Sequence, residues 1–131
     1  MVQLATQLAL FLENKPGTLA RLCDALNKAK INIYALTISD TVDHCVVRVV
    51  LSDTRRALTM CEEHGCVVVE TEVLLVEAPN KPGALAAIAH KLTAAGLNID
   101  YAYFATAPMV KQGLLVLRAN NPKKAMKVLN T

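Results

Sequence analysis

The chain has 131 residues, of which 53% are apolar and 19% are charged, so a packed core is expected and a disordered chain is excluded. Aromatic residues make up only 4% and tryptophan is absent, so Leu, Val, Ile and Ala must fill that core. The net charge of +3 is small for a nucleic-acid-binding protein of this length, and we expect no nucleic-acid partner.

The first half of the chain predicts alternating strands and helices. An apolar strand at 4–12 leads through the turn Asn14-Lys15-Pro16-Gly17 into a helix at 18–29, whose apolar residues recur at helical spacing. A helix end at residue 30 would place Lys30 in the left-handed conformation, at a cost of about 1 kcal/mol. The remaining elements are strands at 31–39 and 45–51 joined by a turn at 40–43, a helix at 54–63 capped by Asp53, and a Val-rich strand at 66–71.

The second half of the chain repeats the first. The turn Asn14-Lys15-Pro16-Gly17 returns 66 residues later as Asn80-Lys81-Pro82-Gly83, and the apolar positions that follow stay in register. Ile31-Asn32-Ile33 returns in the same way as Leu97-Asn98-Ile99. The second copy therefore predicts strands at 73–78, 97–105 and 113–118, a helix at 84–95 that stops at Gly96, and a final helix that begins at Pro122 after an Asn121 cap.

The order of elements in the first copy, β-α-β-β-α-β, is that of the ferredoxin-like unit, a four-stranded antiparallel sheet with two helices on one face. We therefore expect an α+β fold with two repeats, at residues 1–71 and 72–131. The second copy stops at Thr131, directly after its second helix, and so lacks its last strand as given. Its absence would leave a sheet edge unpaired. Because units of about 60 residues are marginal alone, we expect the two repeats to pack together and the chain to form a homodimer.

The sequence gives no sign of a reaction centre or a metal site. Ser39 and Ser52 lie in no nucleophile motif, and the strand neighbours His44 and Cys45 point to opposite faces. The four cysteines form no CxxC pair, so we expect buried or half-buried thiols rather than zinc ligands or disulfides. We therefore expect no catalytic residue, no metal and no cofactor.

The hydropathy pattern indicates no contact with a membrane. Apolar runs such as 8–12 and 73–76 are strand-sized, far below the ~18–20 residues of a membrane helix. The N-terminal sequence also lacks the charged region and the cleavage site of a signal peptide. We therefore expect a cytoplasmic protein.

The polar features that both copies share lie around the first helix. A helix N-terminus presents free N–H groups and a partial positive charge, which can hold a carboxylate. Lys15 or Lys81 adds a cation beside it, and Asn32 or Asn98 can both donate and accept hydrogen bonds. Such a set of groups could hold an α-amino acid. The alternative is structural: Pro-Gly shapes a tight turn, and the asparagines satisfy nearby backbone groups.

At these residues the sequence resembles the ACT-domain family, βαββαβ modules that serve mostly as regulatory, amino-acid-binding units on metabolic enzymes. The family signature is an Asn/Asp-x-Pro-Gly-x-Leu turn followed by a Gly-Ile-Asn-Ile-like segment, and it occurs twice at matching spacing. The resemblance covers essentially the whole chain, which looks like a free-standing tandem ACT protein. One departure is Lys30, where the family usually has Gly.

The resemblance implies ligand sites at ACT–ACT interfaces, built from the turn before the first helix and the start of the second strand. The aromatic residues Tyr101, Tyr103 and Phe104 crowd only the second copy, so we expect the two sites to differ. Carried over by position, the site residues are Asn14, Lys15, Pro16, Gly17, Thr18, Leu19 and Asn32 in the first copy, and Asn80, Lys81, Pro82, Gly83, Ala84, Leu85, Asn98 and Asp100 in the second.

Two functions remain open at this point. The first is a non-catalytic sensor, in which an amino acid bound between ACT units changes assembly or the activity of a partner. The second is a ligand-free module that only dimerises or docks on a metabolic enzyme. A pocket with unpaired groups at Asn98 and at the 80–83 amides would favour the sensor, and a dry interface would favour the module.

Overall fold

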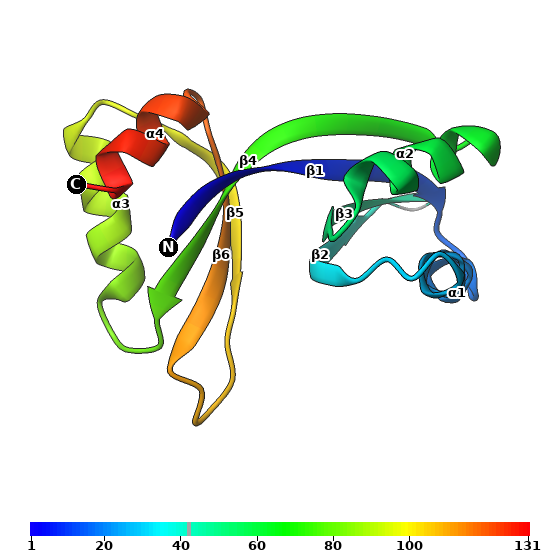
Figure 1. The fold of residues 1–131 in the computed structure, drawn as a ribbon, viewed down its shortest axis with the longest axis horizontal. Coiled ribbons are helices and arrows are strands. Elements are labelled where there is room, and N and C mark those ends of the chain that lie inside the picture. The colour runs from blue at the N-terminus through cyan, green and yellow to red at the C-terminus, as the bar shows by residue number, and fades with distance from the viewer. Residues whose placement is uncertain (42) are drawn as a thin grey trace. The chain divides into compact units, whose positions relative to one another are not determined.

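The computed structural model describes residues 1–41 and 43–131, which divide into two compact units (Figure 1). The N-terminal unit is Thr6–Thr71, and the C-terminal unit combines Met1–Ala5 with Glu72–Thr131. Each unit has the predicted α+β architecture of a ferredoxin-like repeat. Residue 42, which belongs to the predicted turn at 40–43, lies outside the described residues.

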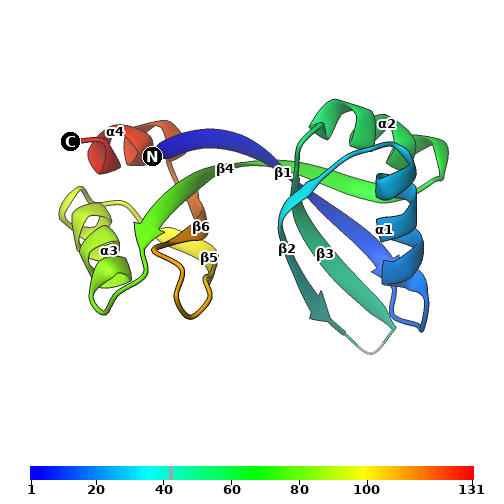
Figure 2. The same cartoon turned by 60° about the horizontal axis from the view of Figure 1, so that its bottom comes forward.

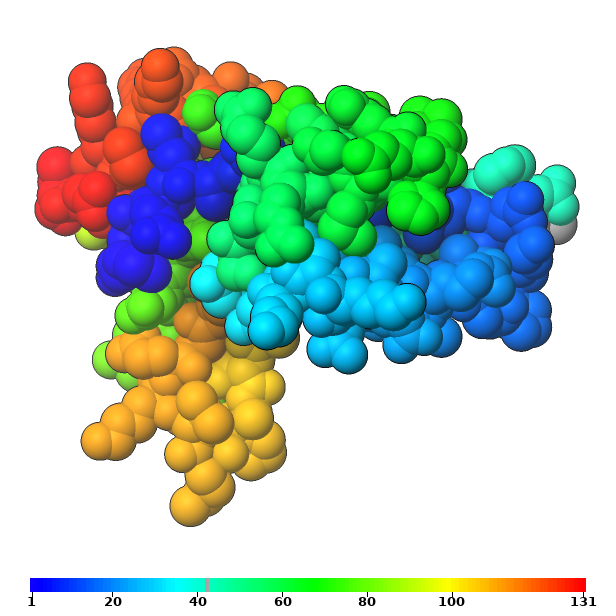
Figure 3. Space-filling model, turned by 45° about the vertical axis from the view of Figure 1, so that its right-hand side comes forward, coloured from blue at the N-terminus to red at the C-terminus, as the bar shows by residue number. Residues whose placement is uncertain are grey.

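The N-terminal unit carries both of its helices on one face of its sheet (Figure 2). In Figure 3 the side chains of α1, in blue, and of α2, in green, lie next to each other on the surface turned toward the viewer. Its strands lie in the order β2-β3-β1-β4. The core forms where apolar residues of β1 and β3, such as Leu10 and Val49, meet Leu26 and Ala57 from the two helices. The elements are β1 (Val2–Glu13), α1 (Thr18–Lys28), β2 (Ile33–Asp40), β3 (His44–Leu51), α2 (Thr54–Glu63) and the first part of β4 (Val67–Pro79).

The C-terminal unit repeats this arrangement, again with both helices on one face (Figure 1). Its strands lie in the order β1-β4-β6-β5. Leu74 and Leu117 from the sheet, with Leu92 and Ala125 from the helices, are fully buried in its core. After β4 the elements are α3 (Ala84–Ala94), β5 (Ile99–Ala105), β6 (Gln112–Ala119) and α4 (Pro122–Leu129).

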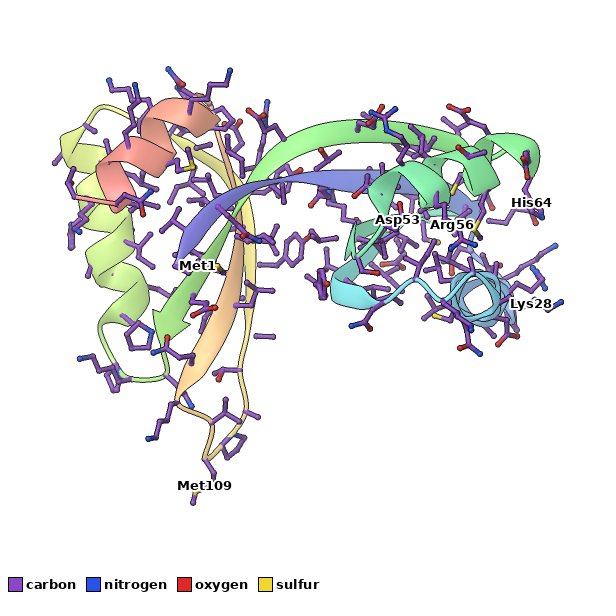
Figure 4. All side chains as sticks on the ribbon, viewed as in Figure 1. Met1, Lys28, Asp53, Arg56, His64 and Met109 are labelled. Carbon is purple, nitrogen blue, oxygen red and sulfur yellow. The ribbon has the colours of Figure 1, made fainter. Side chains whose placement is uncertain are left out.

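The sheet edge predicted to be unpaired in the second repeat is occupied, so this part of the prediction is wrong. The N-terminal end of β1 lies beside β4, where the N–H of Glu77 donates to the carbonyl oxygen of Met1 at 3.0 Å (Figure 4). Val2 and Leu4 pack against the core of the C-terminal unit. The fourth strand of the second repeat therefore comes from the opposite end of the chain.

The strands predicted at 66–71 and 73–78 are one continuous strand, β4. Glu72 lies within it, and its carbonyl oxygen accepts a hydrogen bond of 2.9 Å from Nη1 of Arg118. No Gly, Pro or Asn occurs between residues 67 and 78 to interrupt an extended chain. Strands β1 and β4 therefore each contribute residues to the sheets of both units.

The two predicted N-caps are confirmed. Asp53 accepts the N–H of Arg56 at 3.1 Å in front of α2, and Asn121 accepts the N–H of Lys124 at 3.2 Å in front of α4. Each side-chain oxygen satisfies one N–H that the first turn of a helix leaves free, which is worth about 1 kcal/mol.

Lys30 has the left-handed conformation that the sequence analysis considered for a helix end at this residue. Its φ angle is 58°, and Gly96 has a φ of 71° at the same place in the second repeat. The residue that follows each of them donates its N–H to a carbonyl oxygen in the last turn of the helix. These hydrogen bonds run from Ile31 to Leu26 and from Leu97 to Leu92, and both are 2.9 Å long. Lys30 therefore bears a backbone strain of about 1 kcal/mol that Gly96 does not.

All four cysteines are free, and all are buried or half-buried as predicted. Burial raises the pKa of the Cys61 thiol, and the neighbouring Cys66 raises it further. Among the described residues, no helix has both the length and the apolar character needed to cross a bilayer.

Candidate functional site

The first repeated turn is held by its own backbone. Gly17 has a φ of 89° and stands directly before α1, and the N–H of Thr18 donates to the carbonyl oxygen of Lys15 at 3.3 Å. The side-chain nitrogen of Asn14 donates to the carbonyl oxygen of Thr41 at 3.2 Å. Asn14 therefore ties the start of α1 to the loop between β2 and β3.

The second repeated turn has the same geometry. Gly83 has a φ of 88°, and the N–H of Ala84 donates to the carbonyl oxygen of Lys81 at 3.3 Å. Here the side-chain nitrogen of Asn80 makes two hydrogen bonds, to the carbonyl oxygens of Ala107 at 3.0 Å and Val110 at 2.7 Å. These bonds hold the hairpin between β5 and β6, whose tip is Met109 (Figure 4). The turn asparagine therefore has a structural role in both repeats, which the sequence analysis did not predict.

Both helices that follow these turns begin without a side-chain cap. A glycine occupies the N-cap in each, and glycine has no oxygen to accept the N–H groups of the first turn. Those N–H groups, with the positive end of the helix dipole, are the groups that bind carboxylates at helix N-termini. The N–H of the first residue of each helix, Thr18 or Ala84, is already bonded within the turn, and anion binding by the remaining N–H groups stays a prediction.

The asparagines after the helices are engaged locally. Asn32 accepts the N–H of Ile33 at 2.9 Å through its side-chain oxygen. Asn98 donates from its side-chain nitrogen to Asp100 at 3.0 Å, and Asp100 also lies 3.9 Å from Arg118. A ligand role for Asn32, Asn98 and Asp100 stays a prediction.

A cavity of about 370 Å³ lies at the second turn. It brings together the six predicted turn residues of that repeat, but Asn98 and Asp100 do not line it. The sequence missed its other lining residues, Pro79 and Ala86, and assigned Phe104 to packing rather than to a ligand wall. In the first repeat, Lys15 and Thr18 line a different cavity, which faces α2.

The two lysines of the repeated turns differ in their surroundings. Lys15 lies 2.9 Å from the carboxylate of Glu13, and this contact holds the pKa of Glu13 below its ordinary value. Pro79 stands where Glu13 would be in the second repeat. Within the described part of the chain, Lys81 forms no ion pair, so its ammonium group is available to an anion.

The described residues contain no group of three or more His, Cys, Asp or Glu side chains placed to hold a metal ion. The repeated turns supply backbone N–H groups, one lysine each and apolar walls, and such groups are common in small-molecule sites.

Comparison with known proteins agrees with this fold. The family model for an ACT domain pair matches residues 3–131, and the chain belongs to the ACT-domain family. No curated protein matches the sequence.

Solved structures give the same result. Protein BT0572 from Bacteroides thetaiotaomicron is 34% identical, with a TM-score of 0.90, and the match covers 98% of this chain and 88% of that one. The ligand-free regulatory subunit of aspartate kinase from Thermus thermophilus is 17% identical, with a TM-score of 0.68 and coverage of 98% and 94%. The Thermus flavus subunit is 18% identical, with a TM-score of 0.65 and coverage of 97% and 90%. At these lower identities the two subunits show a shared fold.

Proposed function

We propose that the chain is a non-catalytic regulatory protein that binds an amino acid at the turn before α3. The observation that carries this proposal is the cavity of about 370 Å³ at that turn, where Lys81, Leu85 and Phe104 meet the uncapped start of the helix. Its volume lies in the range of small-molecule sites and is ample for an amino acid.

Each part of an amino acid has a counterpart in the cavity. The first-turn N–H groups of α3 beyond that of Ala84, together with the ammonium group of Lys81, suit the carboxylate. The side-chain oxygen of Asn80, whose nitrogen is occupied by the hairpin, suits the ammonium group. Leu85, which is 40% exposed, and Phe104 suit an apolar side chain. The cavity therefore favours an amino acid with an apolar side chain.

The first turn is expected to bind more weakly. Its Lys15 is paired with the carboxylate of Glu13 at 2.9 Å, whereas Lys81 has no such partner among the described residues. Asn32, Asn98 and Asp100 enter the proposal as residues that would face a ligand in a homodimer. Regulation of a metabolic enzyme in the cytoplasm is also part of the proposal, supported by the shared fold with regulatory subunits of aspartate kinase.

A second candidate function is a ligand-free docking or dimerisation module. The observation that favours it is a pair of apolar side chains at equivalent places: Leu19 is 39% exposed and Leu85 is 40% exposed, each near the start of its helix. Apolar side chains at the same exposed position in both repeats suit a protein interface as well as a ligand wall.

Thermal unfolding in the presence of each of the twenty amino acids at ~10 mM tests the proposal. A ligand with a Kd of about 0.1 mM would then be at ~100 times its Kd and add ~2.7 kcal/mol, a rise in Tm of several degrees. Lys81→Met should abolish the rise, whereas the matched variant Lys15→Met should leave it in place. No rise with any amino acid, in a protein that associates with itself or with an enzyme, would favour the docking module instead.

A further inference from the structure

Two of the four free thiols meet where α2 ends. Cys61 lies in the last turn of α2, and Cys66 stands directly before β4. The N–H of Cys66 donates to the carbonyl oxygen of Cys61 at 2.9 Å, and the N–H of Gly65, with a φ of 71°, donates to Glu62 at 3.1 Å. These bonds around a left-handed glycine form the Schellman ending of a helix. In this ending the two residues of the outer bond commonly bring their side chains into contact.

The outer bond also limits how far apart the two cysteines lie. With standard bond lengths, a hydrogen bond of 2.9 Å leaves the Cα atoms of Cys61 and Cys66 at most about 6.8 Å apart. Disulfides join residues whose Cα atoms lie roughly 4.4–6.8 Å apart. The backbone at this helix end therefore needs no large movement to accept a disulfide between Cys61 and Cys66.

The two side chains lie on the same side of the sheet. Cys61 is 8% exposed and belongs to the core of the N-terminal unit, and Cys66 is half-buried and packs against that core. Both line one cavity of about 330 Å³ between α1 and α2. Burial raises the pKa of the Cys61 thiol, and the Cys66 thiol raises it further, as a second sulfur close by is expected to do. The two thiols are therefore neighbours at the border of the core.

Packing alone does not require cysteine at such a helix end. Helices α1 and α3 end in the same way, with hydrogen bonds of 2.9 Å from Ile31 to Leu26 and from Leu97 to Leu92. At both of these ends the paired side chains are aliphatic and buried. After α2 the same two places hold thiols, which fill less space and can react with each other.

The turn between the two cysteines is ordered by further bonds. Nδ1 of His64, labelled in Figure 4, donates to the carbonyl oxygen of Met60 at 2.7 Å, and the backbone N–H of His64 donates to the same oxygen at 3.1 Å. An ordered turn keeps the two thiols close before they react. Closure of a disulfide between them is then favoured over reaction of each thiol with a separate partner.

We propose that Cys61 and Cys66 are a reversible oxidation site, at which a small-molecule disulfide closes a disulfide bond across the end of α2. Cys66, the more exposed of the two, attacks the small disulfide as a thiolate, forms a mixed disulfide and releases one small thiol. Cys61 then loses its proton to water, attacks the sulfur of Cys66 and releases the second small thiol. Two protein thiols are thereby oxidised by two electrons, and one small disulfide is reduced to two thiols, which carry the two protons.

The oxidised form would replace a helix end held by hydrogen bonds with one held by a covalent bond between α2 and β4. The structure, with all four thiols free, is the reduced form. This site is separate from the amino-acid site proposed at the turn before α3, because the cavity at that turn shares no lining residue with the cavity at Cys61 and Cys66.

Oxidation of the full native chain with about 10 mM oxidised glutathione tests the proposal. The reaction is quenched with acid, free thiols are alkylated, and tryptic peptides are weighed. Because trypsin does not cleave the Lys81–Pro82 bond, Cys61 and Cys66 lie on one peptide, residues 57–91, and Cys23 and Cys45 lie on two others. The expected product is an unalkylated 57–91 peptide about 2 Da lighter than its reduced form, with no cross-link to Cys23 or Cys45. Dithiothreitol should restore two alkylatable thiols on this peptide.

Matched variants separate the roles of the two sulfur atoms. Cys61→Ala should retain one glutathione on Cys66, about 305 Da, because no second thiol resolves the mixed disulfide. Cys66→Ala should slow the reaction at the remaining Cys61 at least about tenfold, because that thiol is buried and stays protonated at neutral pH. Cys23→Ala, at a half-buried thiol of α1, should leave formation of the disulfide unchanged.

Three results would overturn the proposal: two alkylated thiols on the 57–91 peptide after prolonged oxidation, an unsubstituted chain that stops at a mixed disulfide on Cys66, or a disulfide that forms only in urea. Faster reaction of Cys61 than of Cys66 in the single variants would overturn the order of attack. None of these results bears on the amino-acid proposal, which is tested at Lys81.

Discussion

The ring of Phe104 occupies the space that a side chain at Gly113 would need, because a Cβ atom there would lie 2.6 Å from Cε1 of the ring. Gly113 lies on β6 beside β5, and the carbonyl oxygen of Ala105 would be only 2.9 Å away. Any residue other than glycine at this position must therefore displace the ring, which is also a wall of the cavity at the turn before α3.

Gly113→Ala should accordingly destabilise the protein by about 1–3 kcal/mol, the usual cost of overpacking, as measured by urea unfolding. Phe104→Leu in the same chain should recover part of this loss, because a smaller side chain frees the space. Additive effects of the two substitutions in a double-mutant cycle would show that the ring and the glycine do not compete for one place.

The N-terminal strand should stabilise the C-terminal unit through one of its faces. Leu4→Ser removes a side chain that packs against the core of that unit, and we expect a loss of about 2 kcal/mol. Gln3→Ser, on the exposed face of the same strand, should change stability by less than about 0.5 kcal/mol. Hydrogen exchange should show faster exchange in β4, β6 and α4 of the Leu4→Ser variant. Equal losses of stability in the Leu4→Ser and Gln3→Ser variants would contradict the prediction.

Lys30→Gly should stabilise the protein by about 0.5–1 kcal/mol in urea unfolding. Its φ of 58° is unfavourable for a residue with a Cβ atom, and glycine relieves the strain, as Gly96 does in the other repeat. Asp24→Gly, on the exposed side of the middle of α1, should instead destabilise by a similar amount, because glycine is a poor helix former. A loss of stability in both variants would argue against strain at Lys30.

The asparagines of the two turns should contribute unequally. Asn80→Ala breaks two hydrogen bonds to the β5–β6 hairpin and should cost about 1–2 kcal/mol. Asn14→Ala breaks one side-chain bond and should cost roughly half as much. Faster amide exchange at residues 106–111 is expected only in the Asn80 variant, and its absence would show that the hairpin holds its shape unaided.

The stability of the N-terminal unit should fall at alkaline pH through Cys61. Burial raises the pKa of this thiol in the folded protein, so the unfolded chain loses its proton first as the pH rises above the ordinary thiol value of 9.0. Unfolding is therefore favoured between that value and the higher pKa of the folded state. Cys61→Ala should flatten the stability profile in this range, while Cys23→Ala, in which the thiol is only half-buried, serves as the control.

Most of the fold could be predicted from the sequence because its signals are local. The Pro-Gly turns, the caps at Asp53 and Asn121, and the helix end at Lys30 each depend on a few neighbouring residues. The strand that completes the second repeat depends on pairing between Met1 and Glu77, which are far apart in the sequence. Local sequence patterns carry no information on such a long-range contact. The continuity of β4, by contrast, has a local signal, because no Gly, Pro or Asn interrupts residues 67–78.

The candidate site was predictable in part. The repeat located the turn residues at 80–85, because the same Asn-Lys-Pro-Gly sequence has to make the same turn twice. The cavity at that turn needs Phe104 as a wall, and whether a side chain on a strand faces a cavity or the core depends on sheet register. The one local signal for the position of Phe104 was Gly113, because a glycine inside a strand often marks a place where another group approaches the backbone closely.

The pairing of Met1 with Glu77 also sets an order for folding. The N-terminal unit has all of its strands within residues 6–71, so its contacts close loops of moderate length. The C-terminal unit joins the first five residues to the last sixty, and closing so long a loop costs more chain entropy. During synthesis the first unit can be complete while α4 is still unmade, and the N-terminal segment must stay extended and unpaired until β4 emerges. The start of the chain, although made first, thus joins its final sheet late.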